Sequence, residues 1–125
     1  ETYTLAWKHV ILNNPDIKFW VYTRVPSAIK ILKDIDNLSL YFSTDDDNEQ
    51  IAHTLKKTYN IKLAYLGKTF AVSAPKLKEL TGKVGAMCPE NAKRIPLISD
   101  KGSACISCGL CVDGKADIRF SASKK

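Results

Sequence analysis

The hydrophobic pattern of the first eighty residues switches repeatedly between helical and strand spacing. In "YTLAWKHVILNN", apolar residues recur at Tyr3, Trp7, Val10 and Ile11, and Asn13-Asn14-Pro15 ends the pattern. This spacing predicts an amphipathic helix. The next run, "IKFWVYTR", is continuously apolar and aromatic over the length of one strand. Such a run is typical of a strand that is covered on both faces.

The same switch occurs twice more. A helix is predicted from Pro26, with Ile29, Leu32 and Ile35 on one stripe, and the strand "LSLYFST" follows it. Another helix, from about residue 48 to 59, precedes the strand "IKLAYLG". Helices between short strands indicate right-handed crossovers and a parallel sheet.

A shorter stretch completes this part of the chain. "TFAVSA" predicts a short fourth strand, before a brief helix near residues 76–80. We therefore predict an α/β fold of alternating helices and parallel strands, with three to four strands that form an open sheet or a partial barrel.

Residues 81–125 differ in character from the preceding part. They are rich in Gly, Pro, Ser and Lys, show little periodicity, and contain all four cysteines of the chain. A long segment with so little regular structure needs another source of order, and a bound metal centre can supply it. We therefore divide the chain into an α/β scaffold, residues 1–80, and a cysteine-rich cluster-binding segment, residues 81–125.

Composition narrows the class of protein. The 125 residues are 45% hydrophobic and 26% charged, as in an ordinary soluble domain. The sequence shows no membrane-length apolar run and no signal peptide, so we expect a cytoplasmic protein that binds no membrane. The net charge of +6 favours an acidic redox partner or nucleic acid. Because the chain begins with Glu1, we expect a processed form or a piece of a longer protein.

The four cysteines are the strongest chemical signal. Cys88 is followed after 16 residues by Cys105, Cys108 and Cys111, which are three residues apart. Disulfides are disfavoured, because thiols stay reduced in the cytoplasm and cysteines at this spacing form only strained local pairs. Structural zinc sites usually take two separated pairs of ligands, whereas this chain has three cysteines plus one.

An iron–sulfur cluster fits this spacing better. The C-x2-C-x2-C loop supplies three of the four thiolates of a [4Fe–4S] cluster in bacterial ferredoxins. Gly109 lets the backbone run close to inorganic sulfide, and Pro89 follows the remote Cys88. We predict that Cys88, Cys105, Cys108 and Cys111 bind a [4Fe–4S] cluster with a redox or structural role. The alternative is a zinc-stapled module that binds nucleic acid.

These motifs together resemble the gene-product-eighty-eight family of phages and plasmids. The resemblance rests on Trp7, the run "FWVYT", Cys88-Pro89 and the terminal "CISCGLC". It implies that the chain is the C-terminal part of a longer protein with an open barrel similar to that of radical-SAM enzymes. The cluster would then be an auxiliary centre, in the cytoplasm of an infected bacterial or archaeal host.

The resemblance leaves the enzymatic role open. This chain lacks the C-x3-C-x2-C motif of radical-SAM chemistry, so an activity of that kind would require a further segment or another chain.

Other residues give weaker signals. Three carboxylates, Asp45, Asp46 and Asp47, end the second strand and could hold Mg²⁺, but a role at the start of the next helix is favoured. Arg24 ends the first strand and could hold an anion. We assign His9 and His53 to the surface. Six aromatic residues are expected in the core first: Trp7, Trp20, Tyr22, Tyr41, Phe42 and Tyr65.

Overall fold

The computed structural model of the chain describes residues 1–100 and 102–125. Five parallel strands form its main sheet in the order β1-β2-β3-β7-β4. Their bounds are β1 (Phe19–Thr23), β2 (Leu38–Thr44), β3 (Lys62–Gly67), β4 (Ala86–Met87) and β7 (Ile118–Ser121). The predicted α/β class, with helices alternating with parallel strands, is confirmed.

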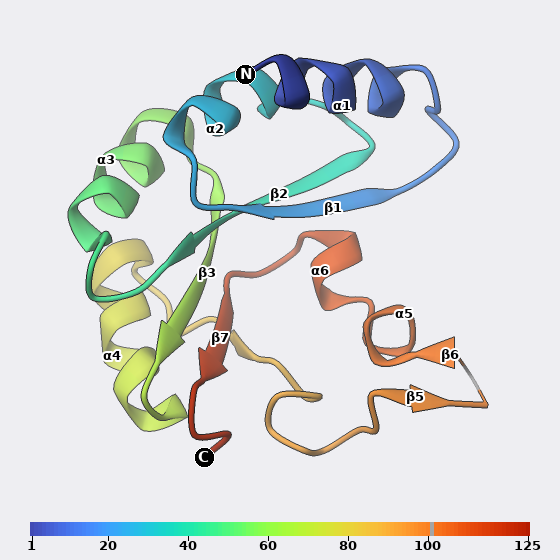
Figure 1. The fold of residues 1–125 in the computed structure, drawn as a ribbon. Coiled ribbons are helices and arrows are strands. Elements are labelled where there is room, and N and C mark those ends of the chain that lie inside the picture. Colours follow the sequence, from blue (N-terminus) through green and yellow to red (C-terminus); the bar gives the residue numbers. More distant parts are fainter. Residues whose placement is uncertain (101) are drawn as a thin grey trace.

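Two sets of elements cover the two faces of this sheet (Figure 1). Four helices lie on one side: α1 (Thr2–Leu12), α2 (Pro26–Leu32), α3 (Glu49–Tyr59) and α4 (Phe70–Thr81). We call this side the helical face. Short elements lie on the other side, which we call the cysteine face: β5 (Ile98–Ser99), β6 (Gly102–Ser103), α5 (Ala104–Cys108) and α6 (Leu110–Asp113). Within the described residues, no helix is long and apolar enough to span a membrane.

The helical face holds the larger hydrophobic core. Side chains at alternate strand positions point to the same side of a sheet, and here they meet the apolar stripes of α2, α3 and α4. The core residues are Ile29, Phe42, Ala52, Leu55, Ile61, Leu63, Tyr65 and Leu77. A smaller cluster of Ile11, Leu32 and Ile35 joins α1 and α2 to the same face.

The cysteine face has a smaller core. Tyr41, Ala64 and Ile118 are buried there. The partly buried Leu110 and Phe120 pack against them. Gly114 connects α6 to the segment that enters β7, with a left-handed φ of 62°. The cysteine face thus buries fewer apolar residues than the helical face does.

One expectation about local structure is wrong, and one strand was not expected from the sequence. "TFAVSA" is not a strand: its last five residues begin α4, and the Thr69 side chain caps this helix by accepting a hydrogen bond from the Val72 amide. The cap outweighs the strand preference of the β-branched and aromatic residues. The strand β7, at the end of a segment expected to be loop-rich, lies inside the sheet between β3 and β4.

The expected aromatic core is also only partly correct. Tyr41, Phe42 and Tyr65 are fully buried, whereas Trp7 and Tyr22 are 43% and 39% exposed. The reason is their position at the margin of the fold. β1 is the edge strand of the sheet, and none of its five residues is fully buried. β1 is therefore only partly covered: four of its five residues are half-buried and Tyr22 is exposed.

Candidate functional site

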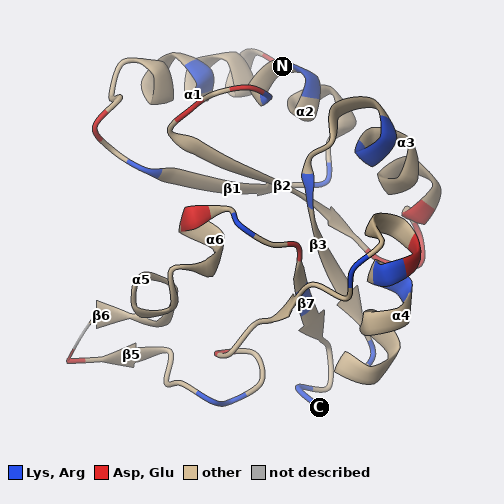
Figure 2. Cartoon of the chain, turned by 180° about the vertical axis from the view of Figure 1, so that it is seen from behind, with Lys and Arg blue, Asp and Glu red and all other residues tan. Residues whose placement is uncertain are grey.

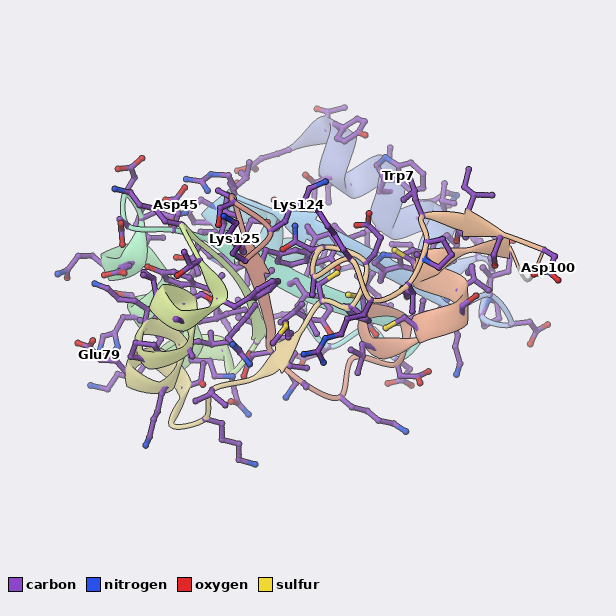
Figure 3. All side chains as sticks on the ribbon, turned by 90° about the horizontal axis from the view of Figure 1, so that it is seen from below. Trp7, Asp45, Glu79, Asp100, Lys124 and Lys125 are labelled. Carbon is purple, nitrogen blue, oxygen red and sulfur yellow. The ribbon has the colours of Figure 1, made fainter. Side chains whose placement is uncertain are left out.

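All four cysteines line one cavity on the cysteine face, with a volume of about 150 Å³. Cys105 and Cys108 lie on α5, Cys111 lies on α6, and Cys88 directly follows β4. In Figure 3 the yellow sulfur atoms lie in the central part of the view. The structure thus brings together the residues that the spacing singles out. Their role as ligands stays a prediction.

Cys88 is held in place by pairing with β7. Its amide donates a hydrogen bond to the Arg119 carbonyl over 3.0 Å, which continues the pairing of β4 with β7. Three residues later, the Asn91 side chain accepts a bond from the Ser121 amide over 2.6 Å. It also donates one to the Ser121 carbonyl over 3.2 Å. The chain on both sides of Pro89 is therefore attached to a central strand.

The other three cysteines are positioned by two very short helices. The Ser103 side chain caps α5 by accepting a hydrogen bond from the Ile106 amide. Gly109 has a φ of 73° and serves as both the end of α5 and the start of α6. This left-handed turn is costly for a residue with a Cβ atom. The Ser39 hydroxyl then donates to the Val112 carbonyl over 2.7 Å, which fastens α6 to β2.

Tyr22 connects the edge strand to the cavity. Its hydroxyl donates a hydrogen bond to Cys111 Sγ over 2.5 Å. The ring meets that of Phe120 edge to face at 6.2 Å and lies 5.3 Å from that of Tyr41. Sequence reasoning assigned Tyr22 to the core and missed this role. The sequence feature that could have drawn attention to Tyr22 is its place in the run "FWVYT", which is part of the family resemblance.

The electrostatics of the cavity bear on what it can hold. Burial raises the pKa of the Cys88 thiol, and backbone hydrogen bonds from Asn91 and Glu90 oppose this rise. Burial also raises the pKa of Cys111, against the hydrogen bond from Tyr22. Negative charge on the other three cysteines raises the pKa of Cys111 further. The four thiols therefore lie close enough to influence one another's charge. A positive centre among them would stabilise their thiolates.

Two further observations limit the site. The four cysteines are all free, with no disulfide among the residues that the structure describes. In the same part of the chain, no three His, Cys, Asp or Glu side chains form a group that could hold a metal ion directly.

The residues proposed at the ends of β1 and β2 have protein partners. Arg24 forms an ion pair with Asp45 over 3.1 Å, and this hydrogen bond lowers the pKa of Asp45. Asp46 accepts a bond from the Tyr65 hydroxyl over 2.9 Å. Asn48 stands directly before α3, but its side chain makes no capping hydrogen bond to that helix; its Oδ1 instead accepts one from the Asp45 amide over 2.9 Å. Lys and Arg are spread over several elements instead of one stripe (Figure 2), and nucleic-acid binding stays a prediction.

Comparison with known proteins agrees with the resemblance. The family described as Gene product 88 matches residues 1–114. The chain is 47% identical over 126 residues to the Gene 88 protein of Mycobacterium phage L5, which covers 99% of this chain and 50% of that protein. It is 42% identical over 127 residues to the Gene 88 protein of Mycobacterium phage D29, with the same coverage. The chain thus spans about half the length of these relatives. No solved structure matches it.

Proposed function

This chain belongs to the gene product 88 family, and we propose that it binds a [4Fe–4S] cluster through Cys88, Cys105, Cys108 and Cys111. The observation that carries the proposal is the convergence of all four cysteines on one cavity. The four are drawn from two parts of the chain, on either side of a 16-residue segment. A cluster that joins them would close this segment against the sheet.

The size and lining of the cavity support a cluster rather than a single ion. Zinc binds four sulfurs at about 2.3 Å from one point, which leaves no large space between them. Here the four cysteines share the lining of a cavity of about 150 Å³ with nine other residues. Most of these nine residues are apolar, among them Leu110, Ile118 and Phe120. Apolar walls of this kind exclude water, and exclusion of water preserves a cluster and tunes its reduction potential.

The cluster would serve first to order the cysteine face, which has little apolar core. An electron-transfer role is the second part of the proposal. Cys105 is exposed, and so is the neighbouring Ile106, at 61%. When bound, a [4Fe–4S] cluster can accept or release one electron. An exposed ligand would bring it close to an acidic redox partner, which the net charge of +6 favours.

The test is anaerobic purification with metal analysis. We expect brown protein with broad absorbance near ~400 nm and about four iron and four sulfide per chain. Replacing Cys108 with Ala should abolish the colour. Replacing the neighbouring, exposed Ser107 with Ala is the matched control and should retain it. Colourless protein with one zinc per chain would overturn the proposal.

An extension of this proposal rests on the family resemblance, and the relatives are long enough to allow it, since this chain covers 50% of each. In the full-length proteins, the cluster held by this region would be an auxiliary centre of a larger, radical-SAM-like enzyme. Purified full-length Gene 88 protein of phage L5 should then contain a second cluster, with about eight iron per chain. A count of four iron would leave the cluster in place and exclude the auxiliary role.

A further inference from the structure

A large apolar groove lies at the opposite margin of the sheet from β4. It has a volume of about 550 Å³ and is bordered by α1, β1 and α2. Five of its eleven lining residues are aromatic: Tyr3, Trp7, Phe19, Trp20 and Tyr22. We call this the β1–α1 groove. An aromatic, open surface of this size on a small protein marks an interaction site.

The backbone of β1 has unused hydrogen-bonding groups at this margin. The Phe19 amide donates to Asn37, toward β2, over 2.8 Å. Because successive residues of a strand face opposite neighbours, the amides and carbonyls of Trp20 and Tyr22 point to the free edge. In the described chain β1 pairs with β2 alone. The strand "FWVYT" also lacks the charged residues and prolines that normally protect an exposed edge.

Helix α1 exposes several large apolar side chains to solvent, beside polar residues such as His9. Ile11 is its one buried residue among those described. Tyr3 is 76% exposed, and Leu5 and Leu12 are each 54% exposed. An ordinary surface helix presents mainly polar residues to solvent and turns its apolar residues toward the core. A covering polypeptide would therefore bury α1 together with the groove.

The lengths of the relatives indicate what the covering polypeptide is. This chain matches 50% of the L5 protein at 47% identity, so a segment of similar length remains unmatched in that protein. In the L5 protein both segments belong to one chain. The tether gives the unmatched segment a high effective concentration at this surface.

We infer that the β1–α1 groove is the docking surface for the polypeptide that corresponds to the unmatched half of the phage Gene 88 proteins. That polypeptide adds a strand to the free edge of β1 and covers the exposed side of α1. The inference does not depend on the cluster. It does have a consequence for the cluster, because Tyr22 lines both the groove and the cysteine cavity. The docked polypeptide would lie against the side chain that bonds to Cys111.

Hydrogen exchange tests the added strand. In this chain alone, the amides of Trp20 and Tyr22 should exchange quickly, whereas that of Val21, which faces β2, should be protected. In the full-length Gene 88 protein of phage L5, the amides aligned with Trp20 and Tyr22 should exchange on the order of 100-fold more slowly. Equal rates in the two proteins would overturn the inference.

Binding between separate chains tests the surface. This chain is co-expressed with the unmatched half of the L5 protein, and the complex is isolated by a tag on that half. The variant Tyr3→Lys should weaken the complex at least about tenfold, because it places a charge in the apolar interface. Ile51→Lys, at a residue on α3 that is 44% exposed, is the matched control and should bind normally.

A second copy of this chain is the competing occupant. If the chain alone forms a stable dimer in which the Trp20 and Tyr22 amides are protected, the groove is a self-interface and the inference is wrong. If the L5 half does not remain soluble when co-expressed, the exchange rates in the full-length protein decide the question.

Discussion

The two faces of the sheet are stabilised in different ways. The helical face buries a cluster of eight residues from three helices and two strands and their flanks. The main cluster of the cysteine face contains three buried residues and partly buried neighbours, among which are two of the cysteines. Helices of seven to twelve residues cover the first face, whereas α5 and α6 have five and four residues.

This difference indicates which parts of the molecule depend on a cofactor. The helical face is held by apolar burial of its own, because α2, α3 and α4 each bury apolar residues against the sheet. The cysteine face is attached by individual hydrogen bonds, such as those of Ser39 to Val112 and of Tyr41 to Ala116. If the proposed cluster supplies the remaining order there, damage to the two faces should have different consequences.

The largest effect is expected from a cavity in the helical face. Phe42 is fully buried in the eight-residue cluster, and Phe42→Ala should lower the free energy of unfolding by about 3–5 kcal/mol. Urea titration followed by circular dichroism measures this loss. The loss should be the same within error with and without iron, because the residue is remote from the cysteine cavity. A loss that appears only in iron-loaded protein would show that the two faces are not independent.

Removal of the cluster should affect the cysteine face and leave the helical face intact. After chelation of iron under reducing conditions, limited proteolysis should cut residues 89–110 on the order of 100-fold faster. Cleavage within α2, α3 and α4 should change little. Mass spectrometry of the first fragments distinguishes the two regions. Equal acceleration in both regions would mean that the cluster stabilises the whole fold, and no acceleration would mean that the segment is ordered without it.

An intermediate effect is expected at the entrance to β4. Gly85 has a φ of 72°, and a Cβ atom there would lie 2.6 Å from the Asp117 carbonyl oxygen and from Leu77. Gly85→Ala should therefore displace β4 and Cys88, destabilise the fold by about 2 kcal/mol and reduce the iron content.

The matched control is Gly82→Ala. Gly82 also has a left-handed φ, of 87°, but a Cβ atom there meets nothing within 4 Å. This variant should show only the backbone strain, about 1 kcal/mol, and should keep its iron. Equal iron content in the two alanine variants would contradict the idea that the entry into β4 positions Cys88.

The difference between the faces also explains how much could be predicted. The helical face follows from local patterns, since Ile29, Leu55 and the strands "LSLYFST" and "IKLAYLG" carry clear periodicity. The convergence of the four cysteines was expected from their spacing along the chain. That spacing matches the needs of a metal centre and does not depend on hydrophobic periodicity. The family assignment came from the same motifs together with the run "FWVYT".

Features that depend on distant contacts could not be predicted. β7 has four residues, too few for a distinct alternation, and its place in the sheet depends on β3 and β4 on either side. Tyr22 was assigned to the core because an aromatic residue in a strand is usually buried. Its hydrogen bond joins residues 89 positions apart, and no local pattern reports such a contact.

The smallest predicted effect concerns that hydrogen bond. Tyr22→Phe keeps the ring against Phe120 and removes the donor to Cys111. A donor to a ligand sulfur stabilises the more negative, reduced cluster, so its loss should lower the reduction potential by about 20–60 mV. Anaerobic redox titration of iron-loaded protein measures the shift.

The control is Tyr41→Phe, which removes a hydroxyl that donates to the Ala116 carbonyl instead of a cysteine. It should leave the potential nearly unchanged. In metal-free protein, Tyr22→Phe should also raise the pKa of Cys111, because the hydrogen bond from Tyr22 lowers it. A ¹³C titration of the Cys111 Cβ measures this rise without any cluster. If the pKa of Cys111 rises but the reduction potential stays the same, the hydrogen bond from Tyr22 to Cys111 forms in the metal-free protein alone. In that case the edge strand β1 would influence the cysteine face only while the site assembles.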